Sequence, residues 1–387
     1  MYFIDNMKRL YIKQVMSNDS RFTVPKEKQL KILSKYSDPT DLIERSYFQY
    51  KCQYEMLDKA KYLYQISAFI ILIVLRFIIP SKIKSNNPKY DLVCFIDGVD
   101  KSIIPRKLLE RYNRIVLFKS RSQMLMTSQD RKWIYKRIIK RYPYDFFFIL
   151  KTLINISNYS YIIETFHPDA ISNHIEYSCC SSLLTQYCID NKVKHINFMH
   201  GEKIWSIRDS FFCFDECYVW DKHYISMFKE LHAKGNFIID IPRKFRQVPN
   251  TSSTLHLSNC DYCYYLANES KEQIDMIIDC LQKLTYKGYS TRVRLHPRYG
   301  NHKYIISECQ KRKIMVEKQN IDINESIMTT QNSISLFSTV LMQSYYLNKN
   351  IIIDDVTCSE KYNILKKLDY IALSYPHRLL SSILEEG

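Results

Sequence analysis

From Tyr90 onward the chain alternates short, strongly apolar segments with stretches of helical periodicity. Such a pattern predicts strands that are buried on both faces and joined by helices, which is typical of a parallel, doubly wound sheet. The first series of predicted strands comprises residues 91–96, 114–118, 161–166, 195–199 and 217–220, with a predicted helix at about 175–191. The second comprises residues 262–266, 291–295, 333–337 and 351–354, with predicted helices at 271–284, 303–313 and 340–347.

A polar break separates the two series. Pro249 to Thr254 contains only proline, asparagine, serine and threonine, which is typical of a linker. Residues 1–89 show helical periodicity without alternation and look like an appendage to the rest of the chain. The predicted fold class is therefore α/β, with an N-terminal helical extension (1–89), an N-terminal α/β domain (90–250) and a C-terminal α/β domain (251–387). Two successive domains of this kind imply a cleft between their facing strand ends.

Glycine is scarce, with six residues in 387. Neither GxGxxG nor GxxxxGK[ST] occurs, which excludes nucleotide binding by the glycine-rich loops of dinucleotide oxidoreductases and P-loop NTPases. A phosphate, if the chain binds one, must be held by side chains and helix ends.

The twelve cysteines have no regular spacing, and the N-terminus lacks the pattern of a signal peptide. Reduced thiols in the cytoplasm are therefore expected. Cys260 and Cys263 form a CxxC pair, but no second CxxC or HxxxH lies at the spacing of a zinc finger, so structural thiols are favoured over a zinc site. Neither a metal nor a cofactor is expected.

The net charge of +16 suggests either nucleic acid or an anionic membrane and anionic substrates as partners. No zinc finger, RNP motif or helix-turn-helix accompanies the charge, so nucleic acid is not expected. The densest basic cluster, residues 131–141, can form an amphipathic helix that lies on a lipid surface or packs on its own domain.

An apolar run at residues 63–79 is at the lower end of the length needed to span a bilayer, and Arg76 interrupts it. The length favours a buried packing helix, while an interfacial membrane helix and a true span stay open.

The end of the predicted strand 291–295 carries cations. Arg294, His296, Pro297 and Arg298 lie at the carboxyl end of this strand, where parallel sheets bind ligands. Ser338 and Thr339 follow another strand and open a helix, whose N-terminus is a second place for a phosphate. Together these residues predict a pocket for a nucleotide sugar.

Candidates for a base end two strands of the first domain. Asp97 follows the strand 91–96, and His200-Gly201-Glu202 follows the strand 195–199. An inverting transfer needs one base for the acceptor hydroxyl and cationic or dipolar groups for the departing phosphate. Asp97 or His200 can be the base.

The polar, aromatic loop after His200 contains Arg208 and Asp209, the candidates for binding the acceptor. Taken singly, these two and also Glu164 and Glu176 are more simply explained as solvated or helix-capping residues.

A strand followed by His296-Pro297 and Arg298, with Ser338-Thr339 opening a later helix, resembles the bacterial sialyltransferases that carry an HP motif and an S-S/T motif. The resemblance implies a GT-B fold, in which two Rossmann-like domains face a cleft, with the acceptor domain at 90–250 and the donor domain at 251–387. It also implies a CMP-activated sugar as donor, Asp97 as base, and His296, Ser338 and Thr339 as ligands of the donor phosphate. Asp97-Gly98 is similar to the acidic motif of that family, but Ile96 replaces its first acid.

Met199 to Lys203 is similar to the histidine-glycine turn of capsule-polysaccharide enzymes and teichoic-acid glycerophosphotransferases, which keeps a CDP-polyol phosphotransferase open as an alternative. A non-catalytic basic protein that binds glycan or nucleic acid is the third possibility. The favoured function is a metal-independent, inverting glycosyltransferase of capsule, O-antigen or lipooligosaccharide synthesis. It would move a sialic-acid-like nonulosonate from a CMP donor to a glycan or lipid-linked glycan, in the cytoplasm and peripherally on the inner face of the plasma membrane.

Overall fold

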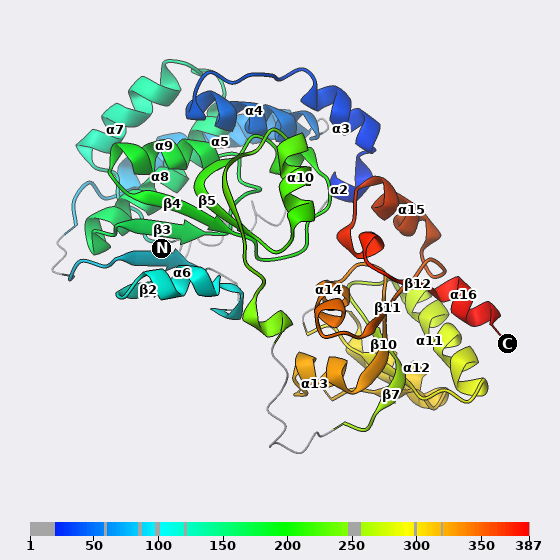
Figure 1. Cartoon of the computed structure of the whole chain (residues 1–387). Helices are drawn as coiled ribbons and strands as arrows, with labels where there is room; N and C mark the ends of the chain where they lie inside the picture. Colours follow the sequence, from blue (N-terminus) through cyan, green and yellow to red (C-terminus); the bar gives the residue numbers. More distant parts are fainter. Residues whose placement is uncertain are drawn as a thin grey trace. The chain divides into compact units, whose positions relative to one another are not determined.

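The computed structural model describes residues 20–57, 60–83, 87–96, 101–119, 122–246, 257–297, 300–318 and 320–386. The chain forms two compact units (Figure 1), one of residues 1–200 and 205–240 and the other of residues 201–204 and 241–387. Each unit contains a six-stranded sheet whose paired strands are all parallel. The predicted fold class, α/β with two Rossmann-like sheets and a helical N-terminal extension, is confirmed. The domain boundaries and the cleft stay predictions.

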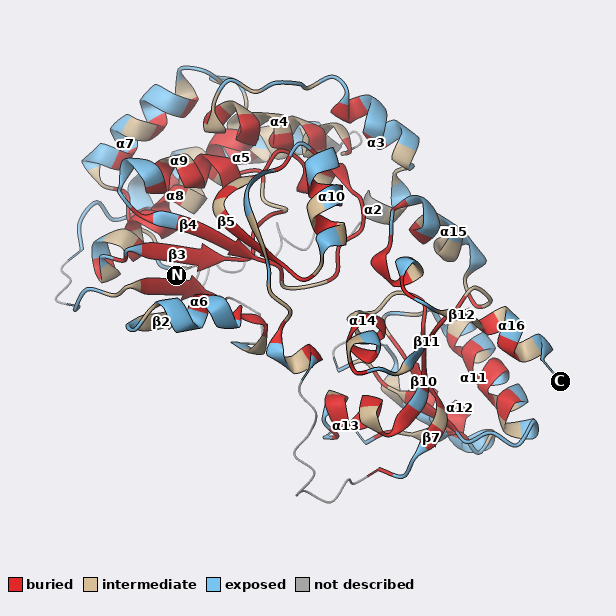
Figure 2. Ribbon diagram, viewed as in Figure 1, coloured by how far each residue is buried: buried red, intermediate tan, exposed pale blue. Residues whose placement is uncertain are grey.

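The sheet of the first unit has the strand order β2-β1-β3-β4-β5-β6. Its strands are β1 (Leu92–Phe95), β2 (Ile115–Phe118), β3 (Ala170–Asn173), β4 (Lys194–Phe198), β5 (Cys213–Val219) and β6 (Lys234–Ile239). Strands β3 and β4 are almost entirely buried (Figure 2), as expected of strands covered on both faces.

Helices cover both faces of this sheet. Helix α6 packs on the face formed by residues such as Leu92, Ile196 and Tyr218, while α8 and α9 contact the opposite face around His195. The N-terminal helices add a further layer, in which α4 packs on α9 and α5 packs on α8. The helices are α2 (Ser20–Thr23), α3 (Lys26–Leu33), α4 (Leu42–Glu55), α5 (Ala60–Ile78), η1 (Lys101–Ile103), α6 (Arg106–Arg111), α7 (Ser128–Ile134), the π-helical turn η2 (Tyr135–Ile139), α8 (Phe146–Phe166), α9 (Ser181–Asp190), η3 (Ile207–Asp209) and α10 (Lys222–Glu230).

The sheet of the second unit has the order β12-β11-β10-β7-β8-β9. Its strands are β7 (Cys260–Tyr265), β8 (Thr291–Arg294), β9 (Met315–Val316), β10 (Thr330–Ser335), β11 (Asn350–Ile353) and β12 (Arg378–Leu379). Its helices are η4 (Arg243–Phe245), α11 (Lys271–Tyr286), α12 (His302–Lys311), α13 (Ile323–Met328), α14 (Thr339–Tyr346), α15 (Ser359–Lys367), η5 (Ile371–Ser374) and α16 (Leu380–Glu385).

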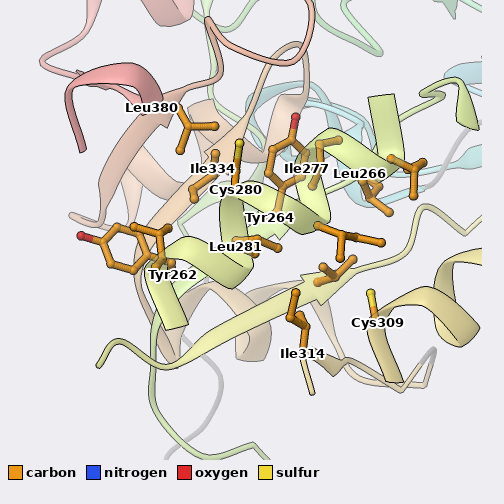
Figure 3. Close-up of a cluster of buried hydrophobic side chains, with 14 of the residues drawn as sticks. Tyr262, Tyr264, Leu266, Ile277, Cys280, Leu281, Cys309, Ile314, Ile334 and Leu380 are labelled. Carbon is orange, nitrogen blue, oxygen red and sulfur yellow. The ribbon is translucent and has the colours of Figure 1, made fainter. Parts of the chain in front are cut away.

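Alternation along β7 builds the two cores of this unit. Tyr262 and Tyr264 pack with α11, α12 and α16 (Figure 3), whereas Cys263 and Tyr265 pack with α13 and α14 on the other face. Cys260 and Cys263 are three positions apart on this strand, so their thiols point to opposite faces. Cys260 Sγ donates instead to the carbonyl oxygen of Tyr262, at 3.1 Å.

Two predicted elements of the first unit are wrong. Residues 161–166 form the last turns of α8 and not a strand, and the strand that follows is β3, within a stretch for which no strand was predicted. The helix predicted at 175–191 begins only at Ser181, which leaves a loop after β3.

Helix α5 is not a buried packing helix, which corrects the favoured interpretation of residues 63–79. Only 11% of its window Lys61–Ile78 is buried, compared with 61% of α8, the other described helix long and apolar enough to cross a membrane. Helix α7 and η2 occupy the basic stretch 131–141, where Ile134 and Ile138 pack inward and the basic residues face outward.

Candidate active site

Strands β1, β3 and β4 of the first sheet are neighbours and end at the same edge. The chain runs from β1 outward to β2 and then returns to β3, so the topology switches between β1 and β3. Open parallel sheets bind ligands at the carboxyl edge beside such a switch. His174 and Glu176 follow β3, and His200 follows β4, which places all three at this edge. Asp97, which follows β1, lies outside the described residues.

Glu176 and His200 form a pair at this edge. The side chain of Glu176 is fully buried, and its Oε1 lies 3.7 Å from Nδ1 of His200, whose side chain is 30% exposed. The rings of His200 and His174 meet edge to face, with centroids 4.7 Å apart. A buried carboxylate stabilises the charged form of a neighbouring imidazole and fixes which ring nitrogen faces it. His200 is therefore suited to take a proton from a substrate hydroxyl.

Two glutamines of helix α4 hold the loops around this pair. Gln49 Nε2 donates to the carbonyl oxygens of Glu176 and Arg208, at 2.9 Å each. Gln53 Nε2, one helical turn later, donates to the carbonyl oxygens of Tyr177 and Arg208, also at 2.9 Å each. The N-terminal extension thus positions the loops of the candidate site.

Arg208 and Asp209, the predicted acceptor-binding residues, lie on η3. The guanidinium of Arg208 is 5.3 Å from the centre of the Tyr177 ring, and that ring is 5.9 Å from the ring of His200. Asp209 is buried, with its carboxylate 3.7 Å from Nε of Arg208. The structure therefore brings Arg208 to the same edge as His200, as an acceptor-binding role requires, and that role stays a prediction.

Glu202, the third predicted catalytic residue, lies in the loop Gly201–Ile204, which groups with the second unit. It is nearly buried there. Burial, and then the Glu202 carboxylate, raise the pKa of Tyr370 well above its usual range.

The second sheet has an equivalent switch between β7 and β10, since β8 and β9 lie on one side of β7 and β10 on the other. His296 and Pro297 follow β8, and Ser338 and Thr339 follow β10. Ser338 is the N-cap of α14, where its side chain accepts from Val340 N at 3.2 Å. Because both strands pair with β7, the predicted donor residues share one edge, with a helix N-terminus among them.

The side chain of Arg294 forms a salt bridge and a hydrogen bond with residues of its own unit. Its guanidinium donates to Glu317 Oε2 at 2.6 Å and to the carbonyl oxygen of Ile321 at 2.8 Å. Nε of the buried Arg292 lies 3.0 Å from Oε1, the other carboxylate oxygen of Glu317. Arg294 still lines a small cavity of about 190 Å³ with Pro297, so it shapes this edge, and it shares the single negative charge of Glu317 with Arg292. Arg298 lies outside the described residues.

The residues missed by the sequence interpretation cluster around β3. His174, Tyr177 and Gln49 are not among the site residues predicted from the sequence, and Glu176 is predicted to be a solvated or helix-capping residue. The loop after β3 could not be recognised without β3, whose four residues, Ala-Ile-Ser-Asn, are only half apolar. The one available signal was the spacing of Gln49 and Gln53, two amides on one face of a helix.

Comparison with protein-family models and with curated protein sequences gave no match. Among solved structures, the chain is similar to the UDP-N-acetylglucosamine 2-epimerase from Rickettsia bellii, with a TM-score of 0.43 and 12% identity over 68% of this chain and 78% of that chain. The wall teichoic acid polymerase TagF has a TM-score of 0.43 and 10% identity, over 85% of this chain and 88% of that chain. A glycosyltransferase from Rickettsia africae has a TM-score of 0.42 and 11% identity, over 77% of this chain and 96% of that chain.

The similar structures thus include a sugar epimerase, a polymer-forming enzyme and a glycosyltransferase. At such TM-scores and identities, the similarity carries no argument about activity or substrate.

Proposed function

We propose that this chain is a glycosyltransferase that uses His200, supported by Glu176, as its base. The observation that carries the proposal is the buried Glu176 carboxylate 3.7 Å from His200 Nδ1, at the switch point of a parallel sheet. The groups proposed to bind the donor phosphate belong to the second unit, a helix N-terminus at Ser338 and the imidazole of His296 at the switch-point edge of its own sheet.

In this reaction the acceptor hydroxyl attacks the anomeric carbon of the donor sugar. The bond between that carbon and the phosphate oxygen breaks, and its electron pair leaves with the nucleotide phosphate. His200 takes the hydroxyl proton, and the Glu176 carboxylate stabilises the resulting imidazolium. The amides at the start of α14 and the side chain of His296 stabilise the charge on the departing phosphate.

The leading donor is a CMP-activated nonulosonic acid such as sialic acid, because His296-Pro297 and Ser338-Thr339 resemble the motifs of CMP-dependent enzymes. The acceptor is a glycan or lipid-linked glycan of capsule, O-antigen or lipooligosaccharide synthesis, and Arg208 binds it. The enzyme acts at the inner face of the plasma membrane and needs no metal.

A CDP-polyol phosphotransferase is the second candidate. The feature that favours it is the histidine-glycine turn, in which His200 lies two residues after the end of β4 and its ring meets that of His174. In that reaction the acceptor oxygen attacks phosphorus and CMP leaves, with His200 again taking the proton.

A thermal-shift screen with CMP, CDP, UDP and GDP tests the proposal. We expect stabilisation by the cytidine nucleotides, with CMP ahead of CDP for the glycosyltransferase and CDP ahead for the phosphotransferase. The shift should be lost in His296→Ala and retained in His167→Asn, which removes an exposed imidazole elsewhere. Stabilisation by UDP or GDP alone would contradict the proposal that the donor is a cytidine nucleotide. The absence of a thermal shift with every nucleotide would favour a non-catalytic basic protein that binds glycan or nucleic acid.

A further inference from the structure

Helix α5 carries a stripe of exposed apolar side chains along its whole length. Leu63, Ile66, Ile70, Ile73 and Phe77 are all at least half exposed, with Phe77 at 81% and Leu63 at 70%. Isolated apolar residues on a surface need no explanation, but a continuous stripe of this size marks a surface that another apolar phase covers.

The opposite side of α5 fastens the helix to the first unit. Ala68 and Leu75 are buried, and Gln65 Oε1 accepts from the backbone N–H of Phe147 at 3.0 Å. Gln65 Nε2 also donates to the hydroxyl of Tyr50 on α4, at 3.0 Å. These contacts hold α5 lengthwise along α8, so its exposed stripe faces away from the core of the unit.

A basic ridge runs beside the stripe. A groove of about 510 Å³ is lined by Phe69, Ile73 and Arg76 of α5 and by Arg131 and Tyr135 of α7 and η2, which places the two elements side by side. The ridge also presents the exposed residues Lys132, Lys136 and Lys140.

Acidic residues are nearly absent from these elements. Among the described residues 60–83 there is no aspartate or glutamate, and among 122–144 the one acid is Asp130. Asp130 is buried, where it accepts from Ser160 and Tyr187 at 2.7 Å each. Acids of other segments pair with two arginines of this surface, Asp190 with Arg137 at 3.8 Å and Asp41 with Arg141 at 2.6 Å. The positive charge next to the stripe is therefore supplied mainly by the exposed Lys132, Lys136 and Lys140.

We propose that α5 and the α7–η2 ridge together form an interfacial binding surface for an anionic lipid bilayer. The apolar stripe enters the boundary between headgroups and acyl chains, and the basic ridge contacts the negatively charged headgroups. A second copy of the chain would suit the stripe but would bring two cationic ridges together, and like charges oppose such an interface. The proposal holds whether or not the chain transfers sugars, because lipid binding is measured without turnover.

Flotation of the full chain with phosphatidylcholine vesicles, with and without phosphatidylglycerol, tests this surface. We expect binding to the anionic vesicles that falls with salt. Lys132→Gln with Lys136→Gln should weaken it about 25-fold, since each basic residue at such a surface contributes about fivefold. The matched pair Lys283→Gln and Lys303→Gln, exposed lysines of the second unit, should bind like the unmodified chain.

The apolar stripe is tested by Leu63→Gln with Phe77→Gln, which we expect to weaken binding at least about tenfold. Its control is Met276→Gln with Ile306→Gln, at exposed apolar positions of the second unit. Equal binding of the stripe variant and the unmodified chain, or indifference of the unmodified chain to anionic vesicles at low salt, would overturn the proposal. A dimer in light scattering that the stripe variant converts to a monomer would assign the stripe to a second copy of the chain. Release of the protein from vesicles by detergent but not by salt would mean that α5 spans the bilayer.

Discussion

Replacing Glu176 by glutamine keeps the size of the side chain and removes its charge. At the observed 3.7 Å between Glu176 Oε1 and His200 Nδ1, a carboxylate and an imidazolium attract each other by about 4 kcal/mol at an effective dielectric constant of about 20. The side chain of His200 is 30% exposed, so solvent screening reduces this value, and we take about half. A loss of about 2 kcal/mol in the stabilisation of the protonated base lowers the rate of the chemical step about 30-fold.

The assay is the initial rate of CMP release from a CMP-activated nonulosonate in the presence of acceptor glycan, for the unmodified chain and for Glu176→Gln. Donor affinity, measured by calorimetry with CMP, should not change, because Glu176 lies in the first unit and the donor residues in the second. The thermal midpoint serves as the control for folding. A folded Glu176→Gln protein with an unchanged rate would refute the role of this carboxylate.

Three further changes test other parts of the structure. His296→Ala should weaken CMP binding and lower turnover about 100-fold through the loss of a phosphate partner, as measured by calorimetry and initial rates, and unchanged values would remove the donor site from this edge. Burial lowers the pKa of His195 to about 3. The unfolded chain, with a histidine pKa of about 6.5, therefore takes up the proton first, and this residue contributes stability above about pH 6.5 that is lost as the pH falls toward 3. When the pH falls from 7 to 5, the free energy of unfolding of His195→Gln in urea should therefore decrease by about 2 kcal/mol less than that of the unmodified chain. An equal decrease in the two proteins would contradict the burial of a neutral imidazole. Gln53→Ala removes the hydrogen bonds to the carbonyl oxygens of Tyr177 and Arg208, so it should lower the free energy of unfolding by about 1–2 kcal/mol. It should also reduce turnover and leave the affinity for CMP unchanged. A change in CMP affinity alone would contradict a role in the first unit.

The second unit was largely predictable from the sequence, because its strands of four or more residues overlap segments with alternating or continuous apolar and aromatic residues, and its helices have clear periodicity. The strand predicted at 262–266 is β7, and the helix predicted at 271–284 is α11, with Ser270 and Gln273 forming a capping box at its start. Short elements such as β9 and β12 have two residues each and were missed, since so few residues carry no pattern.

The first unit was less predictable around β3. Tyr-Ile-Ile-Glu-Thr-Phe at 161–166 favours a strand by local preference, but packing of Ile162 and Thr165 inside the unit keeps these residues in α8. The real strand, β3, contains the buried Asn173, whose Nδ2 lies 2.9 Å from Nε2 of His195 on β4. Tertiary contacts satisfy such a polar side chain, and they are invisible to a pattern of apolar residues.

Whether a site residue was predictable from the sequence also depended on whether the strand before it was predictable. His200, His296 and Ser338 each follow a strand that the sequence predicts, and the structure places them at carboxyl edges of the sheets. Glu176 depends on β3 for its position and on α4 for its loop, a pairing between residues far apart in the chain. Exposure of α5 was equally hidden, because an apolar run has the same composition whether it packs in a core or against lipid.

The most direct test of the proposed function is CMP release from a CMP-activated nonulosonate, measured with membrane glycans as acceptor for the unmodified chain and for His200→Ala. We predict that the unmodified chain releases CMP and transfers the sugar, that His200→Ala does so at least about 100-fold more slowly, and that His167→Asn keeps the full rate. Equal rates for His200→Ala and the unmodified chain would contradict the assignment of His200 as the base, and release of CMP from a CDP-polyol alone would replace sugar transfer by polyol-phosphate transfer.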